Sequence, residues 1–336
     1  MKTLKNLFLV LTLLFTLSCK SDGQMISSIG QFIPPYSSAP PSNEGKTIYI
    51  GYSGFVKKSI DKGLSWTTLA VAASPIWINV SLNQQYISFR NGGSITSSSN
   101  GGTSFTDYAL AVSTQCYSMC DNGIYRFITA SSYGVTSYRY LSTNSGASFS
   151  PLSIKAYYFA NCINGTGQYI SYTIGGGYNG NIFVSSNYGS SFTGKSTSSD
   201  RYCLATDISG QYMLTGIYSG NIQVSNDYGN TWTNININKN WGLAKISPTG
   251  QFMLIADKTT STGTVYYSND YGVSFNLIYT VPAGKIIQSI DLTESGKYIA
   301  VGVSTDGIYL SSDYGANWSI VSSSLGGITP NTIKIF

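Results

Sequence analysis

Ser225–Trp232 reads SNDYGNTW, and variants of this octapeptide recur six more times along the chain. The other copies are SIDKGLSW at Ser59–Trp66, SSNGGTSF at Ser98–Phe105, STNSGASF at Ser142–Phe149, SSNYGSSF at Ser185–Phe192, SNDYGVSF at Ser268–Phe275 and SSDYGANW at Ser311–Trp318. The third residue of each copy is an acid or an amide: Asp61, Asn100, Asn144, Asn187, Asp227, Asp270 and Asp313. These residues are 39, 44, 43, 40, 43 and 43 positions apart, and a period near 40 residues indicates repeated supersecondary units.

Each repeat carries a second element, in which an apolar strand leads into a glycine turn and an aromatic residue, as at Ile208–Tyr212. One period thus holds four short strands with turn signals between them. Four antiparallel strands in some 40 residues are typical of a propeller blade. We therefore expect residues 45–336 to form an all-β, seven-bladed propeller with four-stranded blades.

The two ends of the repeat region complement each other. Thr332–Phe336 matches the first strand of a unit, whereas the first unit opens at Gly45–Ile50 without that strand. We expect the C-terminal strand to complete the first blade, because pairing the ends closes the ring and removes open sheet edges.

The octapeptide resembles the Asp-box, or bacterial neuraminidase repeat, over about residues 45–336. This repeat occurs in sialidases, xyloglucan-cleaving glycosidases, sortilin-type receptors and a photosystem II assembly factor. The resemblance implies a propeller whose motif turns lie on the outer rim, away from the ligand-binding face. It does not imply one activity, because the motif is shared by proteins with different functions.

The motif residues favour a structural role. An Asp or Asn side chain caps a tight turn by accepting backbone hydrogen bonds, the glycine permits a positive φ, and the Trp or Phe anchors the following strand between blades. Three of the seven acid positions are Asn, which a cap tolerates and a catalytic carboxylate does not. The motifs also lack the dense carboxylate set of a Ca²⁺ loop.

The N-terminus is typical of an exported protein. Residues 1–18 combine Lys2 and Lys5 with an apolar run, Leu7–Leu17, as in a signal peptide. The segment before Cys19 resembles a bacterial lipoprotein signal, which implies lipid attachment at Cys19; ordinary cleavage and secretion is the alternative. Residues 19–44 are rich in Ser and Pro and read as a tether. The expected location is the outer membrane, periplasm or cell surface.

Composition excludes several kinds of chemistry. The absence of His rules out Ser–His–Asp and Cys–His catalysis, and Cys116, Cys120, Cys162 and Cys203 lack metal-binding spacing. These cysteines are small buried thiols or disulfide partners. Removal of residues 1–18 lowers the formal net charge from +5 to +3, which is too low to indicate nucleic-acid binding. We expect no metal, no cofactor, and contact with a membrane only through lipid at Cys19.

A hydrolytic site has weak support. No sialidase pattern accompanies the repeats, since the chain holds only four Arg and two Glu. A glycoside hydrolase would need two carboxylates about 5–9.5 Å apart. The candidates are Asp200, Asp257 and Asp306, which are predicted in loops opposite the motif turns.

The same loops favour binding. Tyr158, Arg201 and Trp241 each precede the turn glycine of their unit by nine residues, so periodicity places them around one mouth of the central channel. Trp77, Tyr133 and Tyr178 add aromatic side chains nearby. These aromatics would suit a sugar or a peptide, or they fill the channel and pack between blades.

The leading hypothesis is an exported, lipid-anchored and non-catalytic module that recognises a glycan or a protein through the channel mouth. The alternatives are a glycoside hydrolase that uses the loop aspartates, and an assembly or scaffold factor with a protein client.

Overall fold

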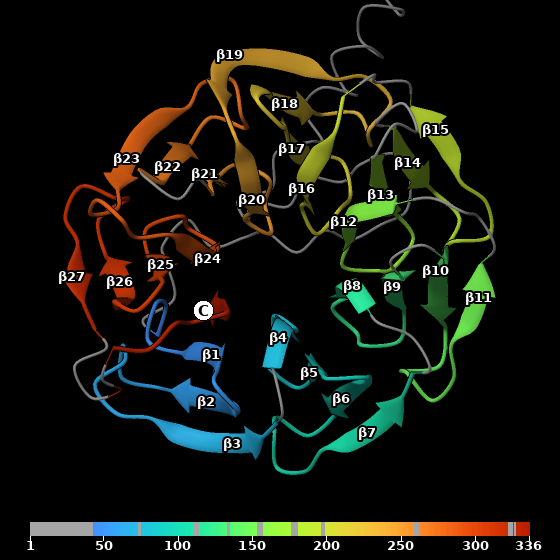
Figure 1. Cartoon of the computed structure of the whole chain (residues 1–336), viewed down its shortest axis with the longest axis horizontal. Helices are drawn as coiled ribbons and strands as arrows, with labels where there is room; N and C mark the ends of the chain where they lie inside the picture. Colours follow the sequence, from blue (N-terminus) through green and yellow to red (C-terminus); the bar gives the residue numbers. More distant parts are fainter. Residues whose placement is uncertain are drawn as a thin grey trace, which may run out of the picture. The chain divides into compact units, whose positions relative to one another are not determined.

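The computed structural model describes residues 43–336 except 73–74, 111–113, 133–134, 153–156, 176–180, 196–198, 259–261, 322–324 and 326. Residues 43–336 form one compact unit of seven four-stranded antiparallel sheets, with no helix among the described residues. Figure 1 shows the seven sheets around a central axis. The predicted seven-bladed β-propeller is therefore confirmed. No described helix is long and apolar enough to span a bilayer.

The blades follow one another along the chain, and within each blade the strands run in order from the innermost to the outermost. Blade 1 is β28 (Thr332–Ile335), β1 (Ile48–Tyr52), β2 (Phe55–Ser59) and β3 (Thr67–Val71). Blade 2 is β4 (Pro75–Val80), β5 (Ile87–Asn91), β6 (Ser94–Ser98) and β7 (Thr106–Ala109). Blade 3 is β8 (Thr114–Met119), β9 (Arg126–Ser132), β10 (Val135–Ser142) and β11 (Ser150–Leu152).

The remaining four blades keep the same order. Blade 4 is β12 (Tyr157–Ile163), β13 (Ile170–Gly175), β14 (Ile182–Ser185) and β15 (Thr193–Lys195). Blade 5 is β16 (Arg201–Thr206), β17 (Met213–Ile217), β18 (Gly220–Ser225) and β19 (Thr233–Lys239). Blade 6 is β20 (Trp241–Ile246), β21 (Met253–Asp257), β22 (Thr264–Ser268) and β23 (Asn276–Thr280). Blade 7 is β24 (Ile287–Leu292), β25 (Ile299–Val303), β26 (Gly307–Ser311) and β27 (Ser319–Ile320).

The two ends of the propeller meet in blade 1, as predicted. Strand β28 pairs antiparallel with β1, with Ile335 opposite Ile48 and Thr332 opposite Gly51. The N–H of Phe336 also donates to the carbonyl of Thr47. This pairing leaves blade 1 with the same four strands as the other blades, and it joins the C-terminus to the start of the ring.

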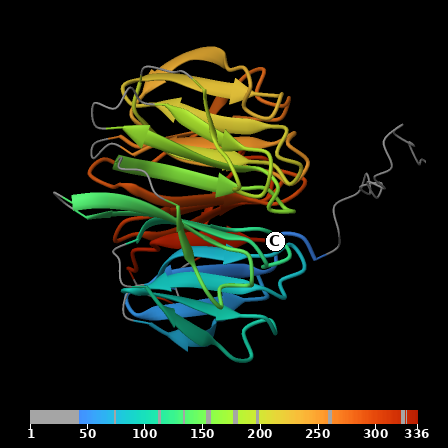
Figure 2. The ribbon, with the colours of Figure 1, turned by 90° about the vertical axis from the view of Figure 1, so that its right-hand side faces the viewer.

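The antiparallel strands divide the connections between two faces (Figure 2). We call turn face the side that carries the seven motif turns and the turns between the first two strands of each blade. The two kinds of turn are bonded to each other, for example by the N–H of Tyr228, which donates to the carbonyl of Gln211 over 3.0 Å. We call loop face the opposite side, which carries the loops between second and third strands and the connections between blades.

The motif turns are held by a repeated set of hydrogen bonds. In blade 5, the Ser225 hydroxyl donates to Asp227 Oδ1 over 2.8 Å and accepts from the N–H of Gly229, while the N–H of Thr231 donates to Asp227 Oδ1. These are the bonds that the predicted cap requires. Asn187 makes the equivalent bonds in blade 4, so an amide oxygen serves as well as a carboxylate.

One feature of these turns was not anticipated from the sequence. The glycine has a positive φ, as predicted, but so does the residue before it: Tyr228 has φ +61° and Gly229 has φ +75°. Left-handed φ is uncommon outside glycine. The same position is left-handed in every motif, where it holds Lys62, Gly101, Ser145, Tyr188, Tyr228, Tyr271 or Tyr314.

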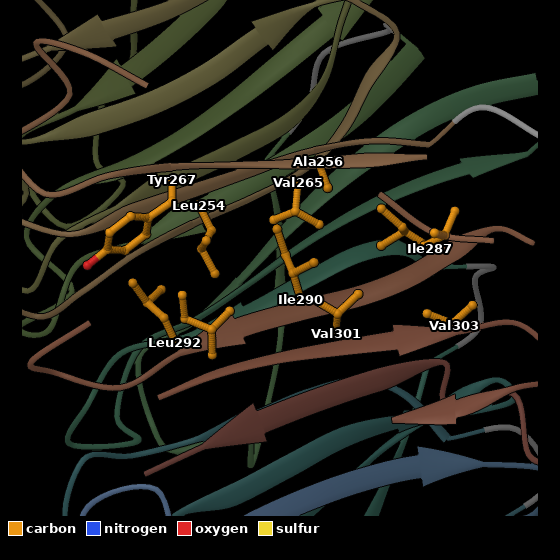
Figure 3. Packing of buried hydrophobic residues seen from close by; sticks show 11 residues of the cluster. Leu254, Ala256, Val265, Tyr267, Ile287, Ile290, Leu292, Val301 and Val303 are labelled. Atoms are coloured by element: carbon orange, nitrogen blue, oxygen red, sulfur yellow. The ribbon is translucent and has the colours of Figure 1, made fainter. Parts of the chain in front are cut away.

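The core lies between the blades. Figure 3 shows side chains of blade 6, among them Leu254 and Val265, beside Ile287, Ile290 and Val301 of blade 7. Burial of such aliphatic side chains is the main stabilising contribution to a fold of this kind. Aromatic pairs link neighbouring blades on the turn face, as where Tyr169 and Tyr228 stack with ring centroids 4.6 Å apart.

Candidate functional site

The candidate site is the channel along the axis of the ring. Its cavity of about 320 Å³ is lined by residues from the innermost strands of all seven blades: β4, β8, β12, β16, β20, β24 and β28. Sites for small ligands occupy about 300–1,000 Å³. The channel is therefore large enough for a small ligand or for the end of a longer chain.

Each of the six innermost strands β4 to β24 is interrupted by a β-bulge near its start. In blade 5, Arg201 pairs with Ile217 and Cys203 pairs with Gly216, so Tyr202 is the extra residue of the bulge. The corresponding bulge positions in the other blades are Trp77–Ile78, Gln115, Phe159, Gly242 and Gln288. A bulge adds one residue and turns the side chains that follow it.

The bulges decide which residues face the channel. Trp77, Tyr202, Gly242 and Gln288 all line it. The side chains of Gln115 and Phe159 lie outside the described residues. Because strand side chains alternate between faces, the residue before a bulge residue points elsewhere.

The predicted channel position of Trp241 and Arg201 is therefore wrong. Trp241 is 1% exposed, and its Nε1 donates to the carbonyl of Gly220 in blade 5 over 2.8 Å. A Cβ on Gly216 would lie 2.2 Å from the Cβ of Trp241, so only glycine leaves room for the indole there. The ring fills the space between blades 5 and 6.

Arg201 is equally buried, within blade 5. Its Nε and Nη2 donate to Gln223 Oε1 over 3.2 and 2.6 Å, and its Nη1 donates to the carbonyl of Ser199. Burial lowers the pKa of Arg201 to about 10. Its guanidinium therefore holds the loop-face end of the blade and is not displayed to a ligand.

Of the other aromatic residues predicted around the mouth, only Trp77 has a side chain within the described part of the structure. Trp77 does line the channel, at 39% exposure and with φ +55°. Tyr158 lies in β12 opposite Ile174, but its side chain is outside the described part. Tyr133 and Tyr178 also lie outside the described residues.

Two tyrosines that sequence reasoning missed stand at the loop-face mouth in blade 5. Tyr202 and Tyr218 are 38% and 53% exposed, and their rings meet edge to face with centroids 5.0 Å apart. The N–H of Tyr218 donates to the carbonyl of Asp200. Burial raises the pKa of Tyr202, and the charge of Asp200 raises it further. Tyr202 was missed because the bulge is not visible in the sequence.

The three carboxylates considered for hydrolysis lie on three different blades. Asp257, at the end of β21, is 3% exposed, which keeps it from a substrate. Asp306 accepts a hydrogen bond from the Tyr309 hydroxyl over 2.6 Å and forms an ion pair with Lys285 at 3.9 Å. Asp200 is partly exposed before β16.

An ion cluster lies on the channel wall where blades 6, 7 and 1 meet. Asp291 Oδ2 is 3.3 Å from Lys334 Nζ, and Asp291 Oδ1 is 3.9 Å from Lys245 Nζ. Burial lowers the pKa of Lys245, while the neighbouring Asp291 opposes that shift. Two cations and one anion leave this wall with an excess positive charge.

The four cysteines are buried thiols that form no disulfide. Burial raises the pKa of Cys116 and of Cys203 to about 12, so both are neutral at physiological pH. Cys162 and Cys120 have raised pKa values for the same reason. No group of three or more acidic, Cys or His side chains within the described ranges could hold a metal ion.

Comparisons with known proteins show the fold and no more. No family model and no curated protein sequence matches this chain. The solved structure of YCF48 from Cyanidioschyzon merolae matches with a TM-score of 0.54 at 12% identity, over 73% of this chain and 84% of that one. YCF48 bound to D1 peptide matches with a TM-score of 0.53 at 12% identity, over 73% and 82%. A GH74 xyloglucanase from Xanthomonas campestris matches with a TM-score of 0.61 at 13% identity, over 87% of this chain and 52% of that one.

Proposed function

We propose that this protein is an exported, lipid-anchored binding module that recognises a glycan or a protein segment at the loop-face mouth of its channel. The observation that carries the proposal is the set of exposed aromatic rings there, Trp77, Tyr202 and Tyr218, beside an open channel. Aromatic side chains combine a large apolar surface with a polar edge and lose little entropy on binding.

The carboxylates of the channel favour binding over hydrolysis. Asp121 accepts a hydrogen bond from the N–H of Leu82, Asp207 accepts from the N–H of Tyr212, and Asp291 is paired with lysine. Each of these carboxylates is thus engaged in a hydrogen bond or an ion pair within the propeller. A two-carboxylate hydrolase needs an acid and a base or nucleophile free to flank the scissile bond.

The first residues of the described propeller are held against blade 7. Glu44 accepts hydrogen bonds from the N–H and hydroxyl of Ser295, over 2.8 and 2.7 Å, in a turn of the turn face. This contact fixes Glu44 on the turn face, opposite the proposed binding mouth.

The structural neighbours support both kinds of ligand. YCF48 has been solved with a D1 peptide, which is a protein ligand, and the GH74 protein is a xyloglucanase, which acts on a glycan. The fold thus serves either recognition task, and the aromatic mouth suits both.

Binding to a glycan array and to surface proteins, measured with the double variant Trp77→Ala/Tyr202→Ala, tests the site. We expect binding to fall by about tenfold or more at an unchanged melting temperature, because both rings are exposed. Tyr271→Ala, on the turn face, is the matched control and should bind normally. Unchanged affinity in the double variant would remove the proposed site.

Fractionation tests the anchor separately. Cys19→Ala should move the protein from the membrane fraction to the soluble exported fraction. Retention of the variant in the membrane fraction would contradict lipid attachment at this cysteine.

A further inference from the structure

One level of the channel wall is built from equivalent residues of all seven blades. In each innermost strand, the residue at this level is paired with the second residue of the next strand, as Lys245 is with Leu254 and Asp291 is with Ala300. The seven residues, from blade 1 to blade 7, are Lys334, Asn79, Ser118, Cys162, Ala205, Lys245 and Asp291, and all of them line the cavity.

The charges of this level are confined to one side. Lys245, Asp291 and Lys334 come from blades 6, 7 and 1, which are neighbours around the ring (Figure 1). The Asp291 carboxylate already has three partners. Besides its ion pairs with the two lysines, it accepts a hydrogen bond from the N–H of Ile335 over 2.8 Å. Within the described part of the chain, the Lys245 ammonium has this carboxylate as its polar partner, at a distance too long for a hydrogen bond. It can therefore donate to a ligand.

At this level the opposite side of the channel offers uncharged polar atoms, while the carboxylates of Asp121 and Asp207 line the cavity nearer the turn face. Ser118 Oγ and Asn161 Oδ1, on blades 3 and 4, are buried and make no hydrogen bond among the described residues. Ser118 is only 8% exposed, and both residues line the cavity. Buried polar atoms are normally paired, so unpaired ones on a cavity wall point to a ligand or to water. Asn161 Oδ1 in particular requires a donor.

We infer that the channel binds an acidic sugar, whose carboxylate lies between Lys245 and Lys334 and whose hydroxyl groups reach Ser118 and Asn161. This inference rests on the proposed binding function and names the chemistry of the ligand. A sugar satisfies both walls, because its carboxylate meets the lysines and its hydroxyls supply the donor that Asn161 Oδ1 requires. The exposed rings of Trp77 and Tyr202 at the mouth suit the next sugar of the chain.

Calorimetry with three probes of nearly equal size tests the inference on the full-length protein: glucuronate, glucuronamide and glucose. We expect glucuronate to bind about tenfold or more tightly than the two neutral sugars, as charged hydrogen bonds predict. Lys245→Met should abolish the preference, Lys245→Arg should retain it, and Lys195→Met, on the outer strand β15, should change nothing.

The outcomes separate this inference from the proposed function. Equal binding of the three sugars, all weakened by Trp77→Ala/Tyr202→Ala, would overturn the acidic-sugar assignment and leave the binding module intact. Equal binding of acetate and glucuronate would also overturn it, since the site would then accept any small anion. Preference for the carboxylate end of a peptide over glucuronate would assign the channel to a protein ligand instead. A melting curve for Lys245→Met that matches the parent protein confirms that loss of binding is not loss of fold.

Discussion

The main-chain N–H of Ile335 donates a hydrogen bond to Asp291 Oδ2 over 2.8 Å, although the two residues are 44 positions apart. Asp291 lies in the innermost strand of blade 7, and Ile335 lies in β28, which completes blade 1. One carboxylate thus bonds the last blade of the ring to the strand that closes the first.

Asp291→Ala should destabilise the propeller by about 3 kcal/mol, because it leaves an N–H without its acceptor and two lysines without their counter-charge. Urea unfolding measures the loss. Asp200→Ala, a change at a partly exposed carboxylate, is the control and should stay within about 0.5 kcal/mol of the parent. Equal midpoints for the two variants would show that the bond to Ile335 does not support ring closure.

Arg139→Ile should stabilise the protein by about 1–4 kcal/mol, as seen when buried charges are replaced by apolar residues. Arg139 is buried against the rings of Tyr172 and Phe192, and its Nε and Nη1 make no hydrogen bond among the described residues. The equivalent position of the other blades is fully buried and aliphatic: Val56, Ile95, Ile182, Ile222, Val265 and Ile308.

Arg126→Ile is the matched control for that prediction. Arg126 is also buried in blade 3, but its guanidinium donates to the carbonyl of Gly123 and to Ser97 Oγ. Its replacement should lower the melting temperature, whereas Arg139→Ile should raise it. A lower melting temperature for both variants would mean that Arg139 contributes more through its aromatic contacts than its burial costs.

Trp241→Ala and Tyr202→Ala should separate packing from recognition. Removal of the buried indole should cost about 3–5 kcal/mol in the free energy of unfolding. Removal of the exposed Tyr202 ring should leave that free energy nearly unchanged and weaken ligand binding. Thermal melts and binding isotherms of the two variants provide the check, and comparable destabilisation by both would contradict the bulge assignment.

Stability should fall in acid through the motif carboxylates. Hydrogen bonds from the side chain and N–H of Ser65 lower the pKa of Asp61 to about 2, and bonds from Asn317 lower the pKa of Asp313. The unfolded pKa is about 4. Because the folded pKa is depressed, the contribution is fully present above about pH 4 and is lost as the pH falls toward 2.

The variant with Asn at Asp61, Asp227, Asp270 and Asp313 should show a shallower loss of stability over that range. Asn100 shows that the replacement is compatible with the turn, since its Oδ1 accepts the N–H of Ser104 and its Nδ2 donates to the Ser104 hydroxyl. Urea midpoints between pH 5 and pH 2 measure the slope. An unchanged slope would place the acid sensitivity elsewhere.

The architecture could be predicted from the sequence because the motif of one blade occurs seven times along the chain. Spacing alone indicated the number of blades, and the match between Thr332–Phe336 and a first strand indicated how the ring closes. The prediction of the fold rested on the period of the repeats and did not depend on the correct assignment of any single strand.

The channel could not be predicted to the same degree. Counting back from the turn glycine selected Trp241 and Arg201, but a bulge one residue later leaves both side chains buried away from the channel. A one-residue offset exchanges the two faces of a strand, and nothing in the local composition marks it. The true channel residues, such as Tyr202 and Gln288, are the immediate neighbours of the selected ones or of their equivalents in other blades.

The recurrence of the bulge in six of the seven innermost strands has a practical consequence. The bulge residues Tyr202 and Gln288 are insertions in their ladders, and both line the channel. These two positions would tolerate randomisation together, whereas Gly242 would not, because a Cβ there would lie 2.7 Å from the Cβ of Lys258. The ring is thus a natural starting scaffold for selecting new receptors from a combinatorial library.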